Sequence, residues 1–130
     1  KFKEKYSSRV KIWAHWLLIV MILIWPAFIK YFTTRGTIAL ALWPFIFLGD
    51  KSSGHDLVLL NHERIHLRQQ LELLLIFFYL IYLGSYLINR IKGMKANEAY
   101  LNICFEREAY LNEKNIDYLK KRKWYSSFNF

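Results

Sequence analysis

The sequence predicts a mainly α-helical membrane protein that folds as one domain. Hydrophobic residues make up 55% and aromatic residues 18% of the 130 positions, which is more apolar than a typical small soluble domain. Two long apolar runs and a helical spacing of apolar residues in the C-terminal half support this fold class. Within residues 1–130 we expect a transmembrane anchor at 12–32 and a core at 36–121.

The net charge indicates the class of binding partner, and the cysteine count excludes some kinds of site. The formal net charge is +9, and an excess of Lys and Arg attracts nucleic acid or anionic lipid. Because these residues flank apolar segments instead of forming a recognition face, we expect membrane lipid and no nucleic acid. The single cysteine, Cys104, excludes an intramolecular disulfide and a Cys-rich zinc site. We expect an integral membrane protein of a bacterial inner membrane.

The first expected element is a transmembrane helix over residues 12–29. This run contains one histidine and no formal charge, and its length suits a bilayer span. Pro26 is expected to kink or end the helix. The run exceeds a signal-peptide core and no small-residue cleavage site follows it, so we expect a retained anchor. Aromatic residues near both ends are typical of an interfacial belt: Trp13, Trp16, Trp25, Tyr31 and Phe32.

An extended segment is expected between residues 33 and 54. Residues 37–48 are rich in strand formers, Gly36 precedes them and Pro44 lies inside them. We expect a short β-hairpin, or one strand and an extended segment. The residues Gly-Asp-Lys-Ser-Ser-Gly at 49–54 indicate a turn. The run is too short to cross a membrane as a helix, and a segment that dips into the membrane is the alternative.

One long helix is expected from residue 56 to residue 91. Asp56 can cap its start and Gly93 ends it. The charged residues lie in its first half, whereas residues 71–89 are nearly all apolar. The helix is therefore expected to run directly into an apolar segment that is long enough to enter a membrane.

The C-terminal helix, expected at 96–121, is amphipathic, since its apolar residues recur at three- and four-residue steps. The basic run at 120–123 is expected to be solvated or to bind lipid headgroups. Glu106, Glu108 and Glu113 have no evident structural purpose on this helix, which points to a functional use.

The residues of chemical interest lie near the start of the long helix. His62 and His66 are four residues apart, so both imidazoles can face a single ion from one side of a helix. Two histidines and one further protein ligand hold a catalytic zinc, with one position left for water. Glu63 lies beside the pair, where it can take a proton from the water that zinc polarises. A polar helix surface near lipid headgroups is the alternative.

The chain resembles the gluzincin metallopeptidases in two motifs. Residues 62–66 read H-E-x-x-H, and residues 106–109 read E-x-x-A, which is similar to the family's downstream pattern E-x-x-A-D. The resemblance covers residues 36–113. It is closest to membrane-embedded peptidases of the CAAX-prenyl-protease and beta-lactam-sensor types.

The resemblance implies a role for each motif residue. The first glutamate of the downstream motif would be the third zinc ligand. The segment around 37–47 would be an edge strand that aligns a peptide or protein substrate through backbone hydrogen bonds. The implied zinc ligands are His62, His66 and Glu106, and the implied general base is Glu63.

Two positions depart from the family pattern. Arg64 is charged, where the family usually has uncharged residues. Tyr110 replaces the aspartate that normally orients a ligating histidine. Because Tyr110 lies one turn after Glu106, its hydroxyl is a candidate for that orienting role or for stabilising an oxyanion. A core aromatic is the alternative interpretation.

The apolar segment 71–91 creates a conflict over topology. If it crosses a bilayer, Glu106 ends on the opposite side from His62, and His55 or Asp56 becomes the substitute third ligand. The distribution of Lys and Arg favours this crossing.

A helical hairpin would remove the conflict. The rise from His66 to Ile91, about 37 Å, is close to the roughly 33 Å that the returning chain can cover. A bend near Gly84–Ser85 would help the chain turn back.

Two functions follow from these observations. The first is a membrane-anchored zinc metallopeptidase that cleaves membrane-proximal proteins or peptides. The second is a non-catalytic membrane subunit of a larger complex with a structural or degenerate metal site. The small size of the chain favours the second, because little chain remains to form a substrate cleft.

Overall fold

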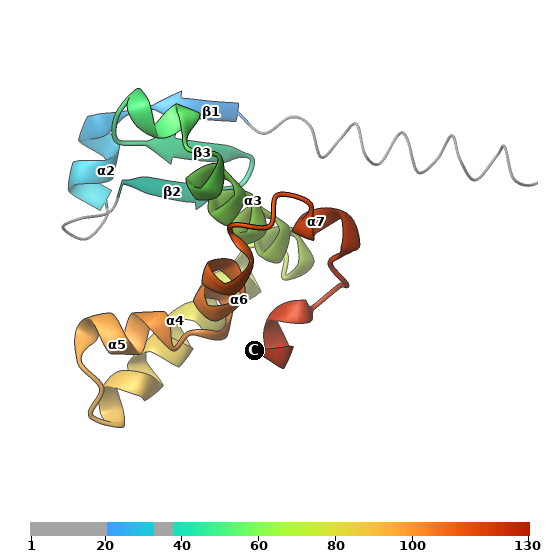
Figure 1. Ribbon diagram of the computed structural model, residues 1–130. Helices are drawn as coiled ribbons and strands as arrows, with labels where there is room; N and C mark the ends of the chain where they lie inside the picture. The colour runs from blue at the N-terminus through green and yellow to red at the C-terminus, as the bar shows by residue number, and fades with distance from the viewer. Residues whose placement is uncertain (1–20, 33–37) are drawn as a thin grey trace, which may run out of the picture.

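The computed structural model describes residues 21–32 and 38–130 (Figure 1). A small sheet lies at one end with α2 beside it, α3 leads away from the sheet, and α4, α5, α6 and α7 form the other side. The N-terminal elements are β1 (Met21–Ile24), α2 (Pro26–Phe32), β2 (Ala39–Leu42), β3 (Phe45–Leu48) and the 3-10 turn η1 (Ser52–His55). The C-terminal elements are α3 (Leu57–Glu72), α4 (Ile76–Ile91), α5 (Ala96–Leu101), α6 (Cys104–Asn112), α7 (Tyr118–Lys121) and η2 (Ser126–Asn129).

The sheet has the strand order β1-β3-β2. β2 and β3 form the hairpin expected within 37–48, and they pair antiparallel with Ala39 opposite Leu48. β1 pairs parallel to β3 with Met21 opposite Phe45. β2 is therefore the outer strand on the side of α3, and most of the contacts between α3 and the sheet are made with β2.

The anchor expected at 12–32 is wrong over the residues that the structure describes. Met21–Ile24 is a strand, and Pro26 begins a short helix instead of ending a long one, as proline at a first helical position does. A short apolar run does not distinguish a buried strand from a helix, and here β3 supplies the strand partner. Residues 12–20 lie outside the described residues.

The long helix expected at 56–91 is two helices. α3 ends at Glu72, α4 begins at Ile76, and the two are bent by 112°. The bend is not at Gly84–Ser85, which lies inside α4. It is at Leu74 and Leu75, whose φ angles of 52° and 55° lie in the left-handed region that leucine rarely adopts.

The C-terminal helix expected at 96–121 is also divided. α5 ends before Asn102, α6 begins at Cys104, and α7 is a single turn that begins at Tyr118. The apolar spacing continues across the first break, because Ala99 in α5 and Ile103, directly before α6, are both fully buried. It does not continue into α7, which buries none of its residues.

The membrane-protein fold class is corrected by these helix lengths. Among the described residues, no single helix is both long and apolar enough to cross a bilayer. Within residues 21–32 and 38–130, α3 and α4 taken together reach that length and composition, with the 112° bend between them. The described chain is six α-helices and a small mixed sheet.

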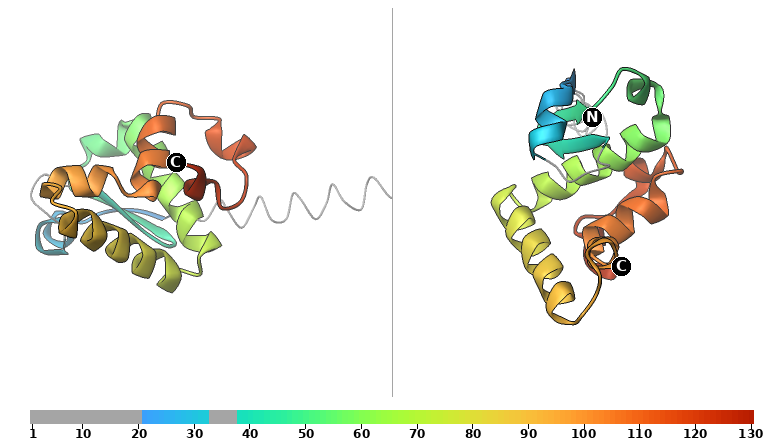
Figure 2. Two further views of the ribbon diagram at one scale, coloured as in Figure 1. Left: turned by 90° about the horizontal axis from the view of Figure 1, so that it is seen from below. Right: turned by 90° about the vertical axis from the view of Figure 1, so that its left-hand side faces the viewer.

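Two apolar clusters lie on either side of α3. One joins the sheet to α3, and its buried members are Ala39, Ala41, Ile46, Leu48, Leu60 and Leu67. The other joins α4 to α5 and α6 through Phe78, Ile103 and Phe105. Between them α3 buries a polar face: Asn61, His62, Glu63, His66, Gln69, Gln70 and Glu72. Figure 2 shows α3 passing between the sheet and α6. Because burial of polar groups is costly unless they are paired, this face needs specific partners.

Candidate metal centre

Three buried side chains converge between α3 and α6. His62 and His66 lie one turn apart on α3, and their Nε2 atoms are 3.0 Å apart. Glu106 on α6 places Oε2 3.5 Å from Nε2 of His62, and Oε1 3.3 Å from Nε2 of His66. Glu106 is the ligand implied by the resemblance, and the three residues form a group that can hold a metal ion.

The spacing of these three donors fits a zinc ion. Tetrahedral ligands at zinc distances of 2.0–2.1 Å lie about 3.3 Å from one another. The two Nε2 atoms are 3.0 Å apart, and each of them lies 3.5 or 3.3 Å from a different oxygen of Glu106, which is close to that value. Two imidazoles and one carboxylate are also the donor set of known catalytic zinc sites.

The other ring nitrogen of His62 is held by an acid. Nδ1 lies 2.9 Å from Oε2 of Glu113, just beyond the end of α6. A carboxylate is an acceptor, so Nδ1 carries the proton and Nε2 presents a lone pair toward the centre. A carboxylate behind a ligating histidine is the usual arrangement in metal sites. Glu113 therefore occupies the position that the sequence interpretation considered for Tyr110.

His66 is oriented by a neutral partner. Its Nδ1 lies 2.8 Å from Oε1 of Gln69. The Gln69 amide nitrogen donates to the Phe105 carbonyl and to Oε2 of Glu108, at 3.1 and 3.0 Å. Because both of these partners are acceptors, the Gln69 oxygen must face His66 and accept from Nδ1. In its neutral form, His66 therefore also directs an unprotonated Nε2 toward the centre.

Two tyrosines hold Glu106. The hydroxyl of Tyr82, on α4, donates to Oε1, and that of Tyr100, on α5, donates to Oε2; both distances are 2.7 Å. Each carboxylate oxygen thus keeps a lone pair for the centre. Burial and the Glu106 charge raise the pKa of both hydroxyls, so they remain protonated donors.

The electrostatics of the centre favour a cation. Burial lowers the pKa of His66, but the charge and hydrogen bonds of Glu106 outweigh it and raise the pKa to about 9. Burial raises the pKa of Glu106, whereas His66, His62 and the Tyr100 hydroxyl lower it more strongly. Three acceptors that face one another attract a positive charge, either a proton or a metal ion. The residues present therefore fit a zinc ion.

Glu63 lies beside the three ligands and is buried. Burial raises the pKa of its carboxyl group, and the imidazoles of His66 and His62 oppose that rise. The carboxylate also accepts a hydrogen bond from the backbone N–H of Ala41 on β2. Glu63 thus lies between the centre and the outer strand of the sheet.

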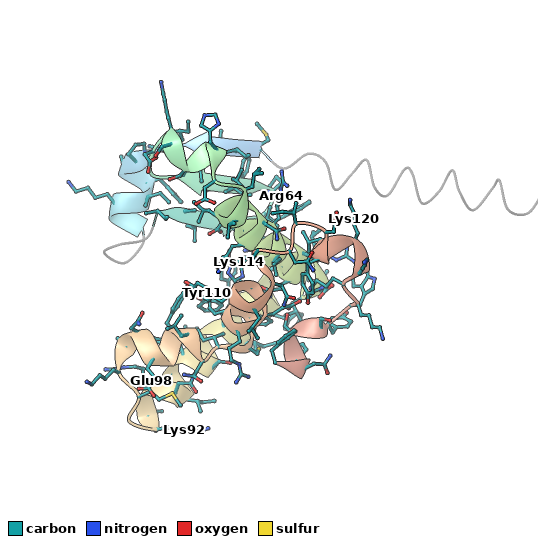
Figure 3. The ribbon with its side chains drawn as sticks, in the orientation of Figure 1. Arg64, Lys92, Glu98, Tyr110, Lys114 and Lys120 are labelled. Carbon is teal, nitrogen blue, oxygen red and sulfur yellow. The ribbon has the colours of Figure 1, made fainter. Side chains whose placement is uncertain are left out.

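Tyr110 contacts the centre through its ring. Its edge packs against the His62 imidazole, with ring centroids 4.6 Å apart, and it also meets Tyr100. The side chain is 45% exposed, and Figure 3 shows it on the side of α6 that faces α5. Tyr110 is therefore both in contact with His62 and partly exposed.

Of the two topologies considered from the sequence, the structure has the helical hairpin that brings Glu106 to the same side as His62. α4 folds back through α5, which returns the chain to α3 and places Glu106 against His62 and His66. The substitute ligands lie elsewhere. His55 is exposed in η1, and Asp56 caps α3 by accepting from the N–H groups of Val58 and Leu59.

The sequence interpretation missed four supporting residues: Gln69, Tyr82, Tyr100 and Glu113. Of these four, only Glu113 stood out in the sequence, as one of three acids without an evident structural purpose on the C-terminal helix.

Glu108, a second of these acids, has a structural role. Arg122 lies 2.5 Å from a carboxylate oxygen of Glu108 and 2.5 Å from one of Glu72. Burial raises the pKa of Glu108, but hydrogen bonds from Arg122, Ser127 and Gln69 lower it more. The basic run at 120–123 was expected to be solvated, and for Arg122, whose side chain is 1% exposed, this is wrong.

Comparisons of the chain with protein-family models, with curated proteins and with solved structures found no match. The chemistry of the centre therefore rests on its own residues.

Proposed function

We propose that this protein is a zinc-dependent metallopeptidase that hydrolyses peptide bonds in proteins or peptides. The observation that supports it is the buried convergence of His62, His66 and Glu106, with Glu63 beside them. A purely structural zinc site closes its coordination with four protein ligands, whereas three ligands leave a position for chemistry.

Each residue of the site has a separate role in hydrolysis. Zinc, when bound, supplies Lewis-acid polarisation of a carbonyl and acidifies water. The carboxylate of Glu63 accepts a proton from the attacking water and then transfers this proton to the leaving amine. Its buried position makes it a stronger base than an exposed glutamate. Tyr110, half-exposed beside His62, donates its hydroxyl hydrogen to the developing oxyanion.

The outer strand of the sheet provides a place for an extended substrate. An added peptide strand would pair with β2 and come next to Glu63, which itself bonds to Ala41. Part of this edge is occupied, because the Gln70 amide bonds to the Ala41 carbonyl and the Trp43 N–H at 2.9 and 2.8 Å. The substrate is therefore expected to pair with the beginning of β2, around Ala39.

The first experiment measures zinc content and hydrolysis of a denatured protein substrate by the same purified preparations. We expect about one zinc per chain, lost in His62→Ala and Glu106→Gln together with hydrolysis. Glu63→Gln should keep the zinc and lose hydrolysis. Glu98→Gln, an exposed position on α5, is the matched control and should change neither.

Two outcomes would contradict the proposal. If the native protein holds no zinc after reconstitution, the centre is not a zinc site. If it holds zinc in a Glu106-dependent way but hydrolyses no substrate, the chain is better described as a non-catalytic subunit with a structural metal.

A further inference from the structure

The outward face of α4 is apolar along its whole length. Side chains at three- and four-residue steps form one stripe, and they are 49–85% exposed. We call it the α4 outer stripe: Ile76, Phe77, Leu80, Leu83, Leu87 and Ile91. The opposite side of α4 packs inward through Phe78 and Tyr82. A surface helix normally has a polar outer face, and a continuous exposed apolar patch marks a binding surface.

Basic residues follow directly at the end of this stripe. Arg90, Lys92 and Lys95 are all exposed, and α4 itself carries no acidic residue. Figure 3 shows Lys92 at the tip of the α4–α5 arm, with the acidic residue Glu98 nearby. The tip thus carries a net positive charge next to an apolar surface.

We propose that the α4 outer stripe binds the surface of an anionic lipid bilayer. The apolar side chains enter the boundary between headgroups and acyl chains, and Arg90, Lys92 and Lys95 pair with lipid phosphates. An exposed apolar helix face next to clustered cations is the pattern of helices that lie in the membrane interface. The cations decide between lipid and an apolar protein partner, because the stripe itself would suit both.

The dimensions of α4 fit a helix that lies on the bilayer. Its sixteen residues rise about 24 Å, which is less than the roughly 30 Å hydrocarbon core. Figure 2 shows α4 along the outer edge of the molecule, with α5 and α6 on its inner side. None of the stripe residues belongs to the metal centre, so lipid binding and zinc binding can be tested separately.

Vesicle flotation of the full chain tests the electrostatic part. The probes are phosphatidylcholine vesicles with and without phosphatidylglycerol. Replacing Arg90, Lys92 and Lys95 together with Gln should weaken partitioning onto the anionic vesicles on the order of 100-fold. The matched control replaces three exposed lysines elsewhere with Gln: Lys114, Lys121 and Lys123. An equal loss in both triple variants would show that only the overall charge matters, and would overturn the proposal.

A fluorescent label tests the apolar part at α4 itself. Leu83→Cys carries the fluorophore in a Cys104→Ser background, and Leu111→Cys on α6 is the control, since both leucines are exposed. We expect lipids with brominated acyl chains to quench the label at position 83 and not at position 111. Absence of quenching at position 83 would overturn the proposal. So would a label that is already shielded before vesicles are added, because another part of the chain or a second copy would then cover the stripe.

Discussion

At the scale of single residues, the tyrosines on Glu106 give a prediction about metal affinity. Tyr82 and Tyr100 each hold one carboxylate oxygen, and loss of such a supporting contact weakens metal binding by about 10–100-fold. Tyr82→Phe and Tyr100→Phe should each lower the affinity for zinc in that range, measured by competition with a chelator. Tyr86→Phe, which packs against the same apolar cluster as Tyr82, should leave it unchanged. Equal affinity in all four proteins would show that the tyrosines only fill space.

Local spacing explains which of these residues could be predicted. His62 and His66 belong to one helical turn, so their shared face follows from the sequence alone. Glu106 was first noticed as one of three acids without an evident structural purpose, and only the resemblance in a second motif gave it the role of a ligand. Tyr82 and Tyr100 gave no signal, since their contact with Glu106 depends on how α4 and α5 fold back. A chain with nine tyrosines does not reveal which two will meet a carboxylate.

At the scale of elements, the junction between α3 and α4 gives a prediction about stability. Leu74 has a φ of 52° and is 70% exposed. A leucine in the left-handed region costs about 1–2 kcal/mol, and part of this is recovered by glycine. Leu74→Gly should therefore raise the free energy of unfolding by about 1 kcal/mol, measured by urea denaturation. Leu83→Gly, exposed within α4, should lower it by about the same amount. A loss of stability at Leu74 would mean that the junction is not strained.

The same junction shows why the helix boundaries were predicted incorrectly. Residues 73–75 are three leucines, without the glycine or proline that usually marks a helix end. Gly84 and Ser85 looked like a better place to bend, yet they lie inside α4. The chain turns at the leucines because the turn lets Phe78 pack against Phe105 in the apolar cluster, and this packing stabilises it. At Met21–Ile24 the deciding partner, β3, is equally remote in sequence.

At the scale of the whole molecule, a polar layer joins the two apolar clusters. The metal centre forms one part of it, and Arg122 forms the other by bridging Glu72 of α3 and Glu108 of α6. Arg122 comes from the C-terminal segment, so a single side chain ties three parts of the chain together. Its removal would leave the buried carboxylate of Glu108 without a counter-charge, and Glu72 with Arg68 alone. Removing one partner in this way is the costly way to break a buried ion pair.

Arg122→Ala should accordingly lower the free energy of unfolding by about 3–5 kcal/mol, measured by chemical denaturation of zinc-free protein. Working without zinc separates this contribution from that of the metal, which stabilises the folded chain by binding. Lys121→Ala, the exposed neighbour, should change stability by less than about 0.5 kcal/mol. If the two variants were equally stable, the C-terminal segment would not hold the clusters together. The metal centre would then have to join α3 to α6 by itself. In that case the backbone amides of α6 in the zinc-free protein would lose protection from hydrogen exchange before those of the sheet do.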